Sequence, residues 1–326
     1  MADVGQGSRP LFLYRHRNLR HFRQKMIPTF PHFKSIEWSD RKEVQQFTCE
    51  FPPYSDFNFV SMYSWNTREK MMLSKLNENL VVLFYDYLTE APFLSFIGKK
   101  RLDETAIELI EYSKLRFKIS ALKLIPEEIA VQLSDLVFAK SLDIDSHDYI
   151  ISVPLLSNLD TLPNAKCPAA PNCRKFIELY PEYYTKHQSA KEILKDDYIG
   201  LFKGWAKAKN LNHWELNEYS AFERFVSNRE TDNYIVSLFN GDKMMGFVSY
   251  EIIPPNYAIC HFVKADIDFK GIYEGMNFAV GKVLKEYGID YWNFEQDMGL
   301  PGLRQSKRKY KPEFYLKKFI VEQNKN

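Results

Sequence analysis

One polar segment, residues 293–312, constrains the fold of this chain most strongly. It begins with the sequence NFEQDMGLPGLR and continues into a basic, aromatic cluster. The interior of a strand has no use for so many polar groups, whereas strand ends in α/β sheets are where ligand-binding groups collect. The segment also closes a strand–loop–helix–strand pattern at 257–297. We therefore expect an α/β sheet in which the end of one strand carries a binding site.

The composition describes a folded globular protein. The chain has 326 residues, 45% of them hydrophobic, with 25 Phe and 20 Tyr, which is enough for two domains with separate cores. No apolar run approaches the roughly 20 residues that span a bilayer. The cysteines at 49, 167, 173 and 260 match neither a disulfide framework nor a zinc-pair spacing, so we expect no metal site. Without a signal peptide, a cytoplasmic location is expected.

Basic residues gather at the two ends of the chain, although the net charge is only +2. Residues 5–36 contain seven Arg or Lys and no acid, and we interpret residues 1–25 as a basic, solvated extension outside the fold. Residues 304–318 contain seven Arg or Lys and one Glu, interleaved with aromatic residues that anchor them to a folded surface. This second run suits a polyanion such as an RNA backbone, a nucleotide cofactor or an acidic lipid headgroup. A merely solvated face fits the charge equally well.

Hydrophobic periodicity predicts two halves that share elements. In the first half, strands are expected at 80–88, 91–98, 119–124 and 148–153, with helices beginning near residues 103 and 126. In the second half, an Asn-Gly turn joins strands at 234–239 and 244–252, followed by a strand at 257–264, a helix at 276–287 and strands at 290–297 and 314–321. Helical spacing is also present at 193–205 and 214–225.

The shared elements indicate an internal duplication of an α/β unit. We expect an α/β (α+β) fold of two tandem domains, each a mixed sheet flanked by helices. The first would cover residues 26–160, a helical linker at 161–230 would open the second domain, and residues 231–326 would form its core. Prolines at 163, 168 and 171 mark the boundary.

The second half resembles a GNAT-type acyltransferase. Residues 264–275 lie where such folds hold the pyrophosphate of coenzyme A on backbone N–H groups at a helix N-terminus. The sequence departs from the Arg/Gln-x-x-Gly-x-Gly/Ala pattern of coenzyme A users, because Gly271 and Gly275 are too far apart and Glu274 would repel the ligand. This departure argues against an ordinary acetyl-CoA enzyme.

A closer resemblance covers residues 30–321. The motifs that carry it are PPYSDFNF from residue 52, SMYSWN from residue 61, Lys264-Ala265, Gly271-Ile272-Tyr273, Asn277, and the long pattern Asn293-x-Glu295-Gln296-Asp297-x-Gly299-x-x-Gly302-Leu303-Arg304-x-x-Lys307-x-x-Tyr310-x-Pro312. With these motifs the chain is similar to the family of the phosphatidylglycerol lysyltransferase C-terminal domain, which comprises tandem GNAT folds. Two departures are Val263, where many members have Glu, and Phe294, where they have Arg.

The resemblance implies transfer of an aminoacyl group from aminoacyl-tRNA to a hydroxyl or amine of a lipid or small molecule, by direct attack on the ester. No cofactor is implied, and the absence of a membrane domain suggests at most a peripheral position at the membrane surface. The resemblance implies catalytic roles for Glu295 and Asp297, in proton transfer or ammonium binding, for Asn293, which would orient one of them, and for Lys307 and Tyr310. The resemblance also implies that the donor is bound by Arg304, Lys264, Tyr273, Asn277, Gly271, Gly299 and Gly302.

Two alternatives stay open beside aminoacyl transfer. An acyl-CoA-dependent N-acyltransferase would need free backbone N–H groups at 270–275, and a non-catalytic binding module would seal the carboxylates of the 293–312 segment from solvent. Strand periodicity places Glu295 and Asp297 on one sheet face. His261 is interpreted as a packed core residue, and Ser61 has no neighbouring His or Asp in the sequence that would mark it as a nucleophile.

Overall fold

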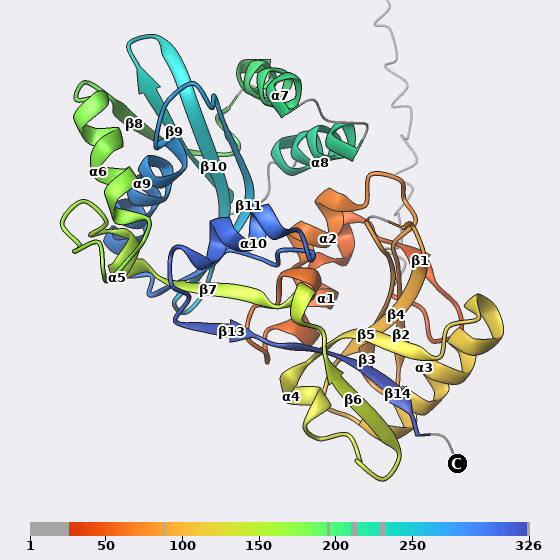
Figure 1. The fold of residues 1–326 in the computed structure, drawn as a ribbon. Coiled ribbons are helices and arrows are strands. Elements are labelled where there is room, and N and C mark those ends of the chain that lie inside the picture. The colour runs from red at the N-terminus through yellow and green to blue at the C-terminus, as the bar shows by residue number, and fades with distance from the viewer. Residues whose placement is uncertain (1–25, 88, 194–195, 210–213, 228–232, 325–326) are drawn as a thin grey trace, which may run out of the picture.

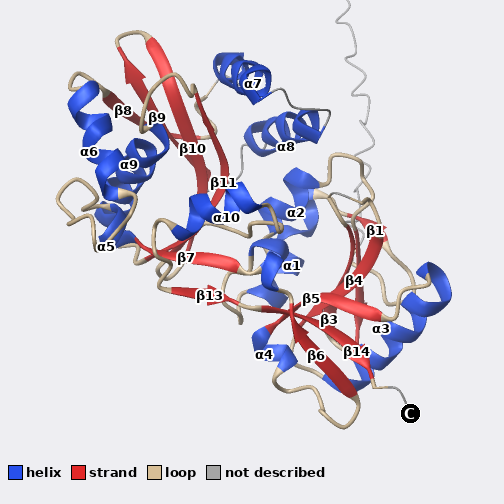
Figure 2. Ribbon diagram, viewed as in Figure 1, coloured by secondary structure: helices blue, strands red, loops and turns tan. Residues whose placement is uncertain are grey.

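The computed structural model describes residues 26–324 except 88, 194–195, 210–213 and 228–232. The basic extension expected at 1–25 lies outside the described residues. Figure 1 shows two halves that each contain sheet and helix, joined by strands that run between them. No helix among the described residues is both long and apolar enough to cross a membrane. The expected α/β class is confirmed, with helices packed on several sheets (Figure 2).

The first half contains an antiparallel sheet in the order β1-β2-β3-β4. Its elements are β1 (Lys34–Ser35), α1 (Arg41–Thr48), α2 (Phe59–Trp65), β2 (Met72–Leu76), β3 (Asn79–Tyr85), β4 (Pro92–Ile97), α3 (Leu102–Phe117), β5 (Ala121–Pro126) and α4 (Glu127–Ala130). The predicted hairpin at 80–98 is the pair β3 and β4, whose Val, Leu and Phe side chains are buried in the core of this half. Helix α3 contributes Ala106, Leu109 and Ile110 to the same core.

The second half is built on a seven-stranded sheet in the order β13-β7-β12-β11-β10-β9-β8. Its elements are α5 (Val153–Leu156), α6 (Ala170–Leu179), β8 (Tyr184–Ser189), α7 (Asp196–Lys209), α8 (Trp214–Ser227), β9 (Asn233–Asn240), β10 (Lys243–Ile253), β11 (Tyr257–Ala265), α9 (Ile272–Glu286), β12 (Tyr291–Asn293) and α10 (Pro301–Arg308). Helix α9 crosses between the parallel strands β11 and β12, as the predicted pattern requires.

The two halves exchange strands. β7 (Asp148–Ser152) follows β6 (Phe138–Leu142) in the chain, yet it pairs with β12 and with β13 (Phe314–Leu316) in the sheet of the second half. Near the end of the chain, β14 (Lys318–Gln323) crosses the other way and pairs with β5 and β6 of the first half. Each half therefore depends on a strand supplied by the other, and in Figure 1 β7 and β13 run along the junction.

The observed strands differ from three sequence expectations. The sheets do not follow the expected domain limits 26–160 and 231–326, since β7 and β14 belong to the opposite halves. The strand expected at 314–321 is two strands separated at Lys317, where the chain passes from one sheet to the other. The strand expected at 290–297 ends at Asn293, because Glu295 and Met298 have left-handed backbone angles, with φ of 57° and 53°. The strands β6 and β8 were not predicted, and β8 lies within the region 161–230 that was expected to be helical.

A buried ion pair lies where the two exchanged strands begin. Lys318 is the first residue of β14 and Asp148 the first of β7, and both side chains are inaccessible to solvent. The Lys318 Nζ donates to Asp148 Oδ1 at 2.8 Å and also to the carboxylate of Asp56. Asp148 accepts two further hydrogen bonds from Ser55, through the backbone N–H at 2.7 Å and the hydroxyl at 2.6 Å. The lysine charge is thus neutralised without water.

Replacing this lysine tests whether the ion pair holds the exchange together. Lys318→Met would leave two buried carboxylates without their cation, so we expect a loss of about 3–5 kcal/mol in the free energy of unfolding, measured by urea denaturation. The neighbouring Lys317 pairs with Glu127 at the surface, where 46% and 37% of the two side chains are exposed. Lys317→Met is the matched control and is expected to cost less than about 1 kcal/mol. Equal losses in both variants would contradict this role.

Candidate functional site

The candidate site lies where β11 and β12 separate. Residues Tyr257–Ile259 of β11 pair with Tyr291–Asn293 of β12. There β12 ends, whereas β11 continues to Ala265. Helix α2 of the first half packs beside this free stretch of β11, with Trp65 stacked on Phe262 at 5.6 Å between ring centroids. The chain segment after Asn293 enters the same space. Three separate parts of the sequence therefore meet at one point between the two halves.

The chain turns sharply at Glu295, and its neighbours hold that turn in place. Asn293 Oδ1 accepts a hydrogen bond from the Glu295 N–H at 2.8 Å. The buried Lys307 Nζ donates to the carbonyl oxygens of Phe294 at 2.5 Å and Gln296 at 2.6 Å, on either side of Glu295. Lys307 thus acts as a clamp for the left-handed turn. It fixes the direction in which the Glu295 side chain points.

The Glu295 carboxylate points toward a serine and a histidine from two other elements. Its Oε1 lies 3.4 Å from Ser61 Oγ in α2 and 3.9 Å from His261 Nδ1 in β11. Ser61 Oγ is also 3.2 Å from the same His261 nitrogen. His261 is the extra residue of a β-bulge, since Ser249 of β10 pairs with Phe262 and Tyr250 pairs with Cys260. The bulge turns the imidazole toward α2.

A second carboxylate lies on the far side of the histidine. Glu251 Oε2 is 3.8 Å from His261 Nε2, and both side chains are buried. The negative charge of Glu251 is balanced by Arg41, whose Nη2 donates at 3.0 Å, and the carboxylate also accepts a hydrogen bond from Asn58 Nδ2 at 2.8 Å. Arg41 and Asn58 belong to the first half and Glu251 to the second. The contacts around His261 therefore also join the two halves.

Burial makes Glu295 an unusually weak acid. Desolvation raises the pKa of Glu295 to about 8, with Asp148 and Asp56 raising it and Lys307 and Lys318 opposing them. Burial likewise lowers the pKa of Lys307, although the negative charge of Glu295 acts in the other direction. A quarter of the Glu295 side chain, 24%, remains exposed to solvent. A carboxylate with a pKa near neutrality and partial access has the properties of a general base.

Asp297 does not join Glu295, so the expectation of two acids on one face is wrong. Its carboxylate is fully buried and accepts hydrogen bonds from Tyr149 Oη at 2.5 Å, Arg304 Nε at 2.7 Å and the Gly299 N–H at 2.9 Å. Burial alone would raise the pKa of Asp297, but these donors, Arg304 first, lower it. Because the strand ends at Asn293, its alternation no longer governs where these two side chains point. Asp297 instead fixes the loop against α10.

Most of the other predicted site residues lie away from the Glu295 turn and contact other groups. Tyr310 is buried, and its hydroxyl accepts a hydrogen bond from Asn277 Nδ2 at 3.0 Å. Lys264 pairs with Glu218 at 2.7 Å and lies 3.4 Å from the centre of the Trp205 ring, which also contacts Tyr273. The structure thus brings together Glu295, Asn293 and Lys307 and places the rest elsewhere.

Two of the predicted glycines are required by backbone geometry. Gly271 has φ of 78° at the start of α9, and a Cβ there would lie 2.5 Å from the Asn172 carbonyl oxygen. Gly299 has φ of 71°, and a Cβ would meet the Asp145 carboxylate at 2.9 Å. By contrast, a Cβ at Gly302 in α10 would meet no atom within 4 Å. Gly271 and Gly299 thus allow close approach of chain segments.

Sequence reasoning missed part of the cluster around Glu295. The interpretation of Ser61 as unpartnered is wrong, because His261 is close in space although 200 residues away in the chain. His261 is packed, as expected, but it also faces Ser61 and Glu295. Glu251, Arg41 and Asn58 were not singled out at all. No local pattern marks a β-bulge or a contact between halves, so the sequence contained no signal for them. No cluster of metal-ligand side chains occurs among the described residues.

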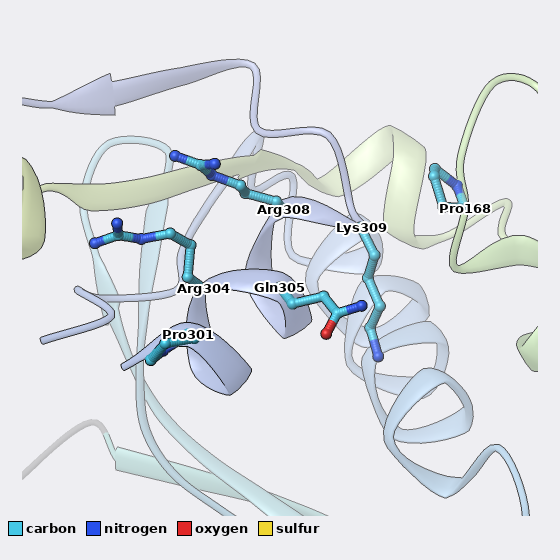
Figure 3. Close-up of a pocket in the computed structure, with 6 residues that line it drawn as sticks. All are labelled: Pro168, Pro301, Arg304, Gln305, Arg308 and Lys309. Carbon is cyan, nitrogen blue, oxygen red and sulfur yellow. The ribbon is translucent and has the colours of Figure 1, made fainter. Parts of the chain in front are cut away.

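A basic groove lies on the outer side of α10. It has a volume of about 590 Å³ and is lined by Pro168, Pro301, Arg304, Gln305, Arg308 and Lys309. Figure 3 shows that the side chains come mainly from α10, with Pro168 opposite. Arg304 is tied to Asp297 and Asp145, and Lys309 to Glu274. Arg308 is exposed, and its side chain also contacts the Tyr149 hydroxyl. Because Lys307 of the same helix clamps the Glu295 turn, α10 connects the groove to the candidate site.

Comparison with known proteins places the chain in a family. Residues 51–322 match the family described as phosphatidylglycerol lysyltransferase, C-terminal. The chain therefore belongs to the phosphatidylglycerol lysyltransferase C-terminal family. This membership confirms the resemblance inferred from the sequence motifs, and it supports an acyltransferase-type function. A comparison with curated proteins gives no significant match.

Solved structures show the same fold as this family member. A conserved protein of unknown function from Bacteroides thetaiotaomicron superposes with a TM-score of 0.73 at 23% identity, covering 92% of this chain and 100% of that one. The L-PGS of Bacillus licheniformis superposes with a TM-score of 0.58 at 12% identity, covering 93% of this chain and 95% of that one. At these identities the likeness concerns the fold, and it extends over nearly the whole chain.

The raised pKa of Glu295 makes a prediction about stability. An acid whose pKa is higher in the folded chain binds its proton more tightly there. The free energy of unfolding therefore falls as the pH rises from about 4.5 to about 8. Each pKa unit corresponds to about 1.4 kcal/mol. Glu295→Gln removes this penalty, so it should be more stable than the wild type at pH 8.5 but not at pH 4. Urea denaturation at the two pH values measures the difference, and a constant difference would contradict the raised pKa.

Proposed function

We propose that this protein transfers an aminoacyl group from aminoacyl-tRNA to a hydroxyl or amine of a lipid or small molecule. The observation that carries the proposal is the Glu295 carboxylate, which is partly exposed between the two halves and has a pKa of about 8. An aminoacyl ester is already an activated electrophile. The enzyme must therefore position the ester and remove one proton from the acceptor. We assign the removal of that proton to Glu295.

Lys307 and Asn293 serve this base as positioning residues. Lys307 binds the carbonyl oxygens on both sides of Glu295, and its positive charge holds the pKa of Glu295 below the value that burial alone would give. Asn293 bonds the Glu295 N–H through its side-chain oxygen and Asp148 through its side-chain nitrogen, at 2.8 and 3.2 Å. The catalytic roles proposed for Asp297 and Tyr310 lose their support, because both groups are buried in contacts of their own.

The loop before α9 gives little support to an acyl-CoA-dependent reaction. Three backbone N–H groups that would bind a pyrophosphate are already engaged: Lys270 with Tyr180 Oη, Ile272 with the Phe269 carbonyl and Gly275 with the Gly271 carbonyl. Helix α6 also crowds Gly271 through the Asn172 carbonyl. In addition, Glu274 places a carboxylate in the first turn of α9, held by Lys309 at 2.6 Å. A nucleotide pyrophosphate would have to displace these groups.

A transfer assay with Glu295→Gln tests the proposal. The purified protein is incubated with a mixture of radiolabelled aminoacyl-tRNAs and a total lipid extract supplemented with small amines. We expect label in an ester or amide product, and a loss of about 100-fold or more in Glu295→Gln because the general base is gone. Glu313→Gln, at an exposed acid outside the site, is the matched control and should keep full activity. No transfer from any charged tRNA by the wild type would refute the proposal.

The pH dependence of the same assay follows from the pKa of Glu295. A general base works only when it is deprotonated, so the rate of transfer should rise with pH and reach half its maximum near pH 8. A rate that is independent of pH between 6 and 9 would remove Glu295 from the role of base.

The groove beside α10 is the surface that we assign to the phosphates of the donor. Arg308→Ala should weaken the binding of tRNA and reduce the slope of log affinity against log salt by about 1, since one phosphate contact is lost. Arg101→Ala is the matched control, because this arginine lies in the first half and 64% of its side chain is exposed. Fluorescence anisotropy with labelled tRNA at several salt concentrations gives both slopes. Identical slopes for the two variants would place the tRNA elsewhere.

A further inference from the structure

The hydroxyl of Ser61 lies between two groups that can exchange protons. Ser61 Oγ is 3.4 Å from Glu295 Oε1 and 3.2 Å from His261 Nδ1. Ser61 comes from α2 of the first half, whereas Glu295 and His261 come from the second half. The contact therefore exists only when the two halves are joined. Nothing in the transfer chemistry described above uses Ser61, which makes its position an observation to be explained.

A purely structural role explains this hydroxyl poorly. The backbone N–H of Ser61 is capped by Asn58 Oδ1 at 2.8 Å, so α2 does not need the serine side chain at its start. Ser64, in the same short helix, has a buried hydroxyl for which no hydrogen-bond partner is found among the described residues. The two buried serines of this helix therefore differ in their surroundings. Of the two, Ser61 is the one whose hydroxyl faces titratable groups.

His261 fixes the orientation of this hydroxyl. The β-bulge turns the imidazole toward α2, and its Nε2 is buried with no hydrogen-bond partner within the described part of the chain, the nearest carboxylate being Glu251 at 3.8 Å. Nδ1 is therefore the ring nitrogen with a polar partner, and that partner is Ser61. When Nδ1 carries the proton, it donates to Ser61 Oγ and leaves the serine proton free to point elsewhere. That proton then faces Glu295 or an oxygen of a bound substrate.

We infer that Ser61 is the general acid of the transfer reaction, with His261 as its positioning residue; the inference rests on the function proposed above. The acceptor attacks the ester carbonyl, forming the new C–O or C–N bond, and its proton passes to Glu295. As the ester C–O bond of the donor breaks, Ser61 gives its proton to the leaving ribose oxygen and recovers one from Glu295. No proton is gained or lost overall, and no other reactant is needed. As a general acid, Ser61 would affect only the departure of the ribose oxygen. A group that merely binds the donor would affect transfer from any donor.

This role is tested by changing the leaving group. An alkoxide leaves poorly without a proton, whereas a thiolate leaves readily on its own. The two donors are 2′(3′)-O-aminoacyl-adenosine and the N-acetylcysteamine thioester of the same amino acid, with the acceptor held constant. We expect Ser61→Ala to slow transfer from the oxygen ester by about 100-fold, as for a lost general acid, and to leave transfer from the thioester nearly unchanged. Rapid-quench rates of product formation provide the measurement.

Two further variants separate this role from simple disruption. Ser61→Thr keeps a hydroxyl at the same place and should keep most of the rate with the oxygen ester. Ser64→Ala removes the unpartnered hydroxyl of the same helix and should leave the rates with both donors unchanged. Thermal unfolding of each variant, compared with the wild type, shows whether α2 remains docked. A Ser61→Thr variant that is folded but as slow as Ser61→Ala would overturn the inference.

The remaining outcomes are equally decisive. If Ser61→Ala slows both donors alike, Ser61 acts by positioning and not as a proton donor. If mass spectrometry of the quenched wild-type protein finds the acyl group on Ser61, the serine is a nucleophile and the inference is wrong. Either result leaves aminoacyl transfer itself standing. If the wild type uses neither donor nor any charged tRNA, the proposed function fails, and the role of Ser61 fails with it.

Discussion

The buried pair of Lys318 and Asp148 is the interaction on which the rest of the structure depends. It joins the first residues of the two exchanged strands, β14 and β7, and both side chains are shielded from water. A charge pair of this kind is costly to bury and still more costly to break, because one partner left alone has no solvent to stabilise it. The pair therefore favours one arrangement of the two halves over others. We expect the pair to contribute specificity of assembly more than a large net gain in stability.

The same pair connects the assembly of the halves to the candidate site. Asp148 accepts a hydrogen bond from the Asn293 side chain at 3.2 Å, and Asn293 in turn binds the N–H of Glu295. Asp148 also binds Ser55, just before α2, the helix that presents Ser61. Its negative charge contributes to the raised pKa of Glu295. One buried carboxylate thus helps to position Glu295 and to set its acidity, which links the tandem architecture to the base that we propose.

Family membership and local geometry contribute different kinds of information. The match over residues 51–322 supports an acyltransferase-type function, and solved relatives at low identity support the fold. Neither reveals which side chains of this chain act. That assignment rests on the contacts of Glu295, Ser61 and His261. The loop before α9 bears on the choice of donor, since three of its backbone N–H groups already have hydrogen-bond partners within the chain.

The sequence by itself determined the local elements and the importance of the 293–312 segment. Short-range sequence patterns predict the Asn-Gly turn, the helix α9 and the buried strands β3 and β11, because these elements depend on neighbouring residues. It also singled out Glu295, Lys307 and Asn293. Only the tertiary structure decided that Asp297 turns away from Glu295, that Ser61 meets His261, and that β7 and β14 change halves. These outcomes depend on left-handed turns, a β-bulge and contacts between residues about 200 positions apart. No periodic pattern in the sequence predicts such features.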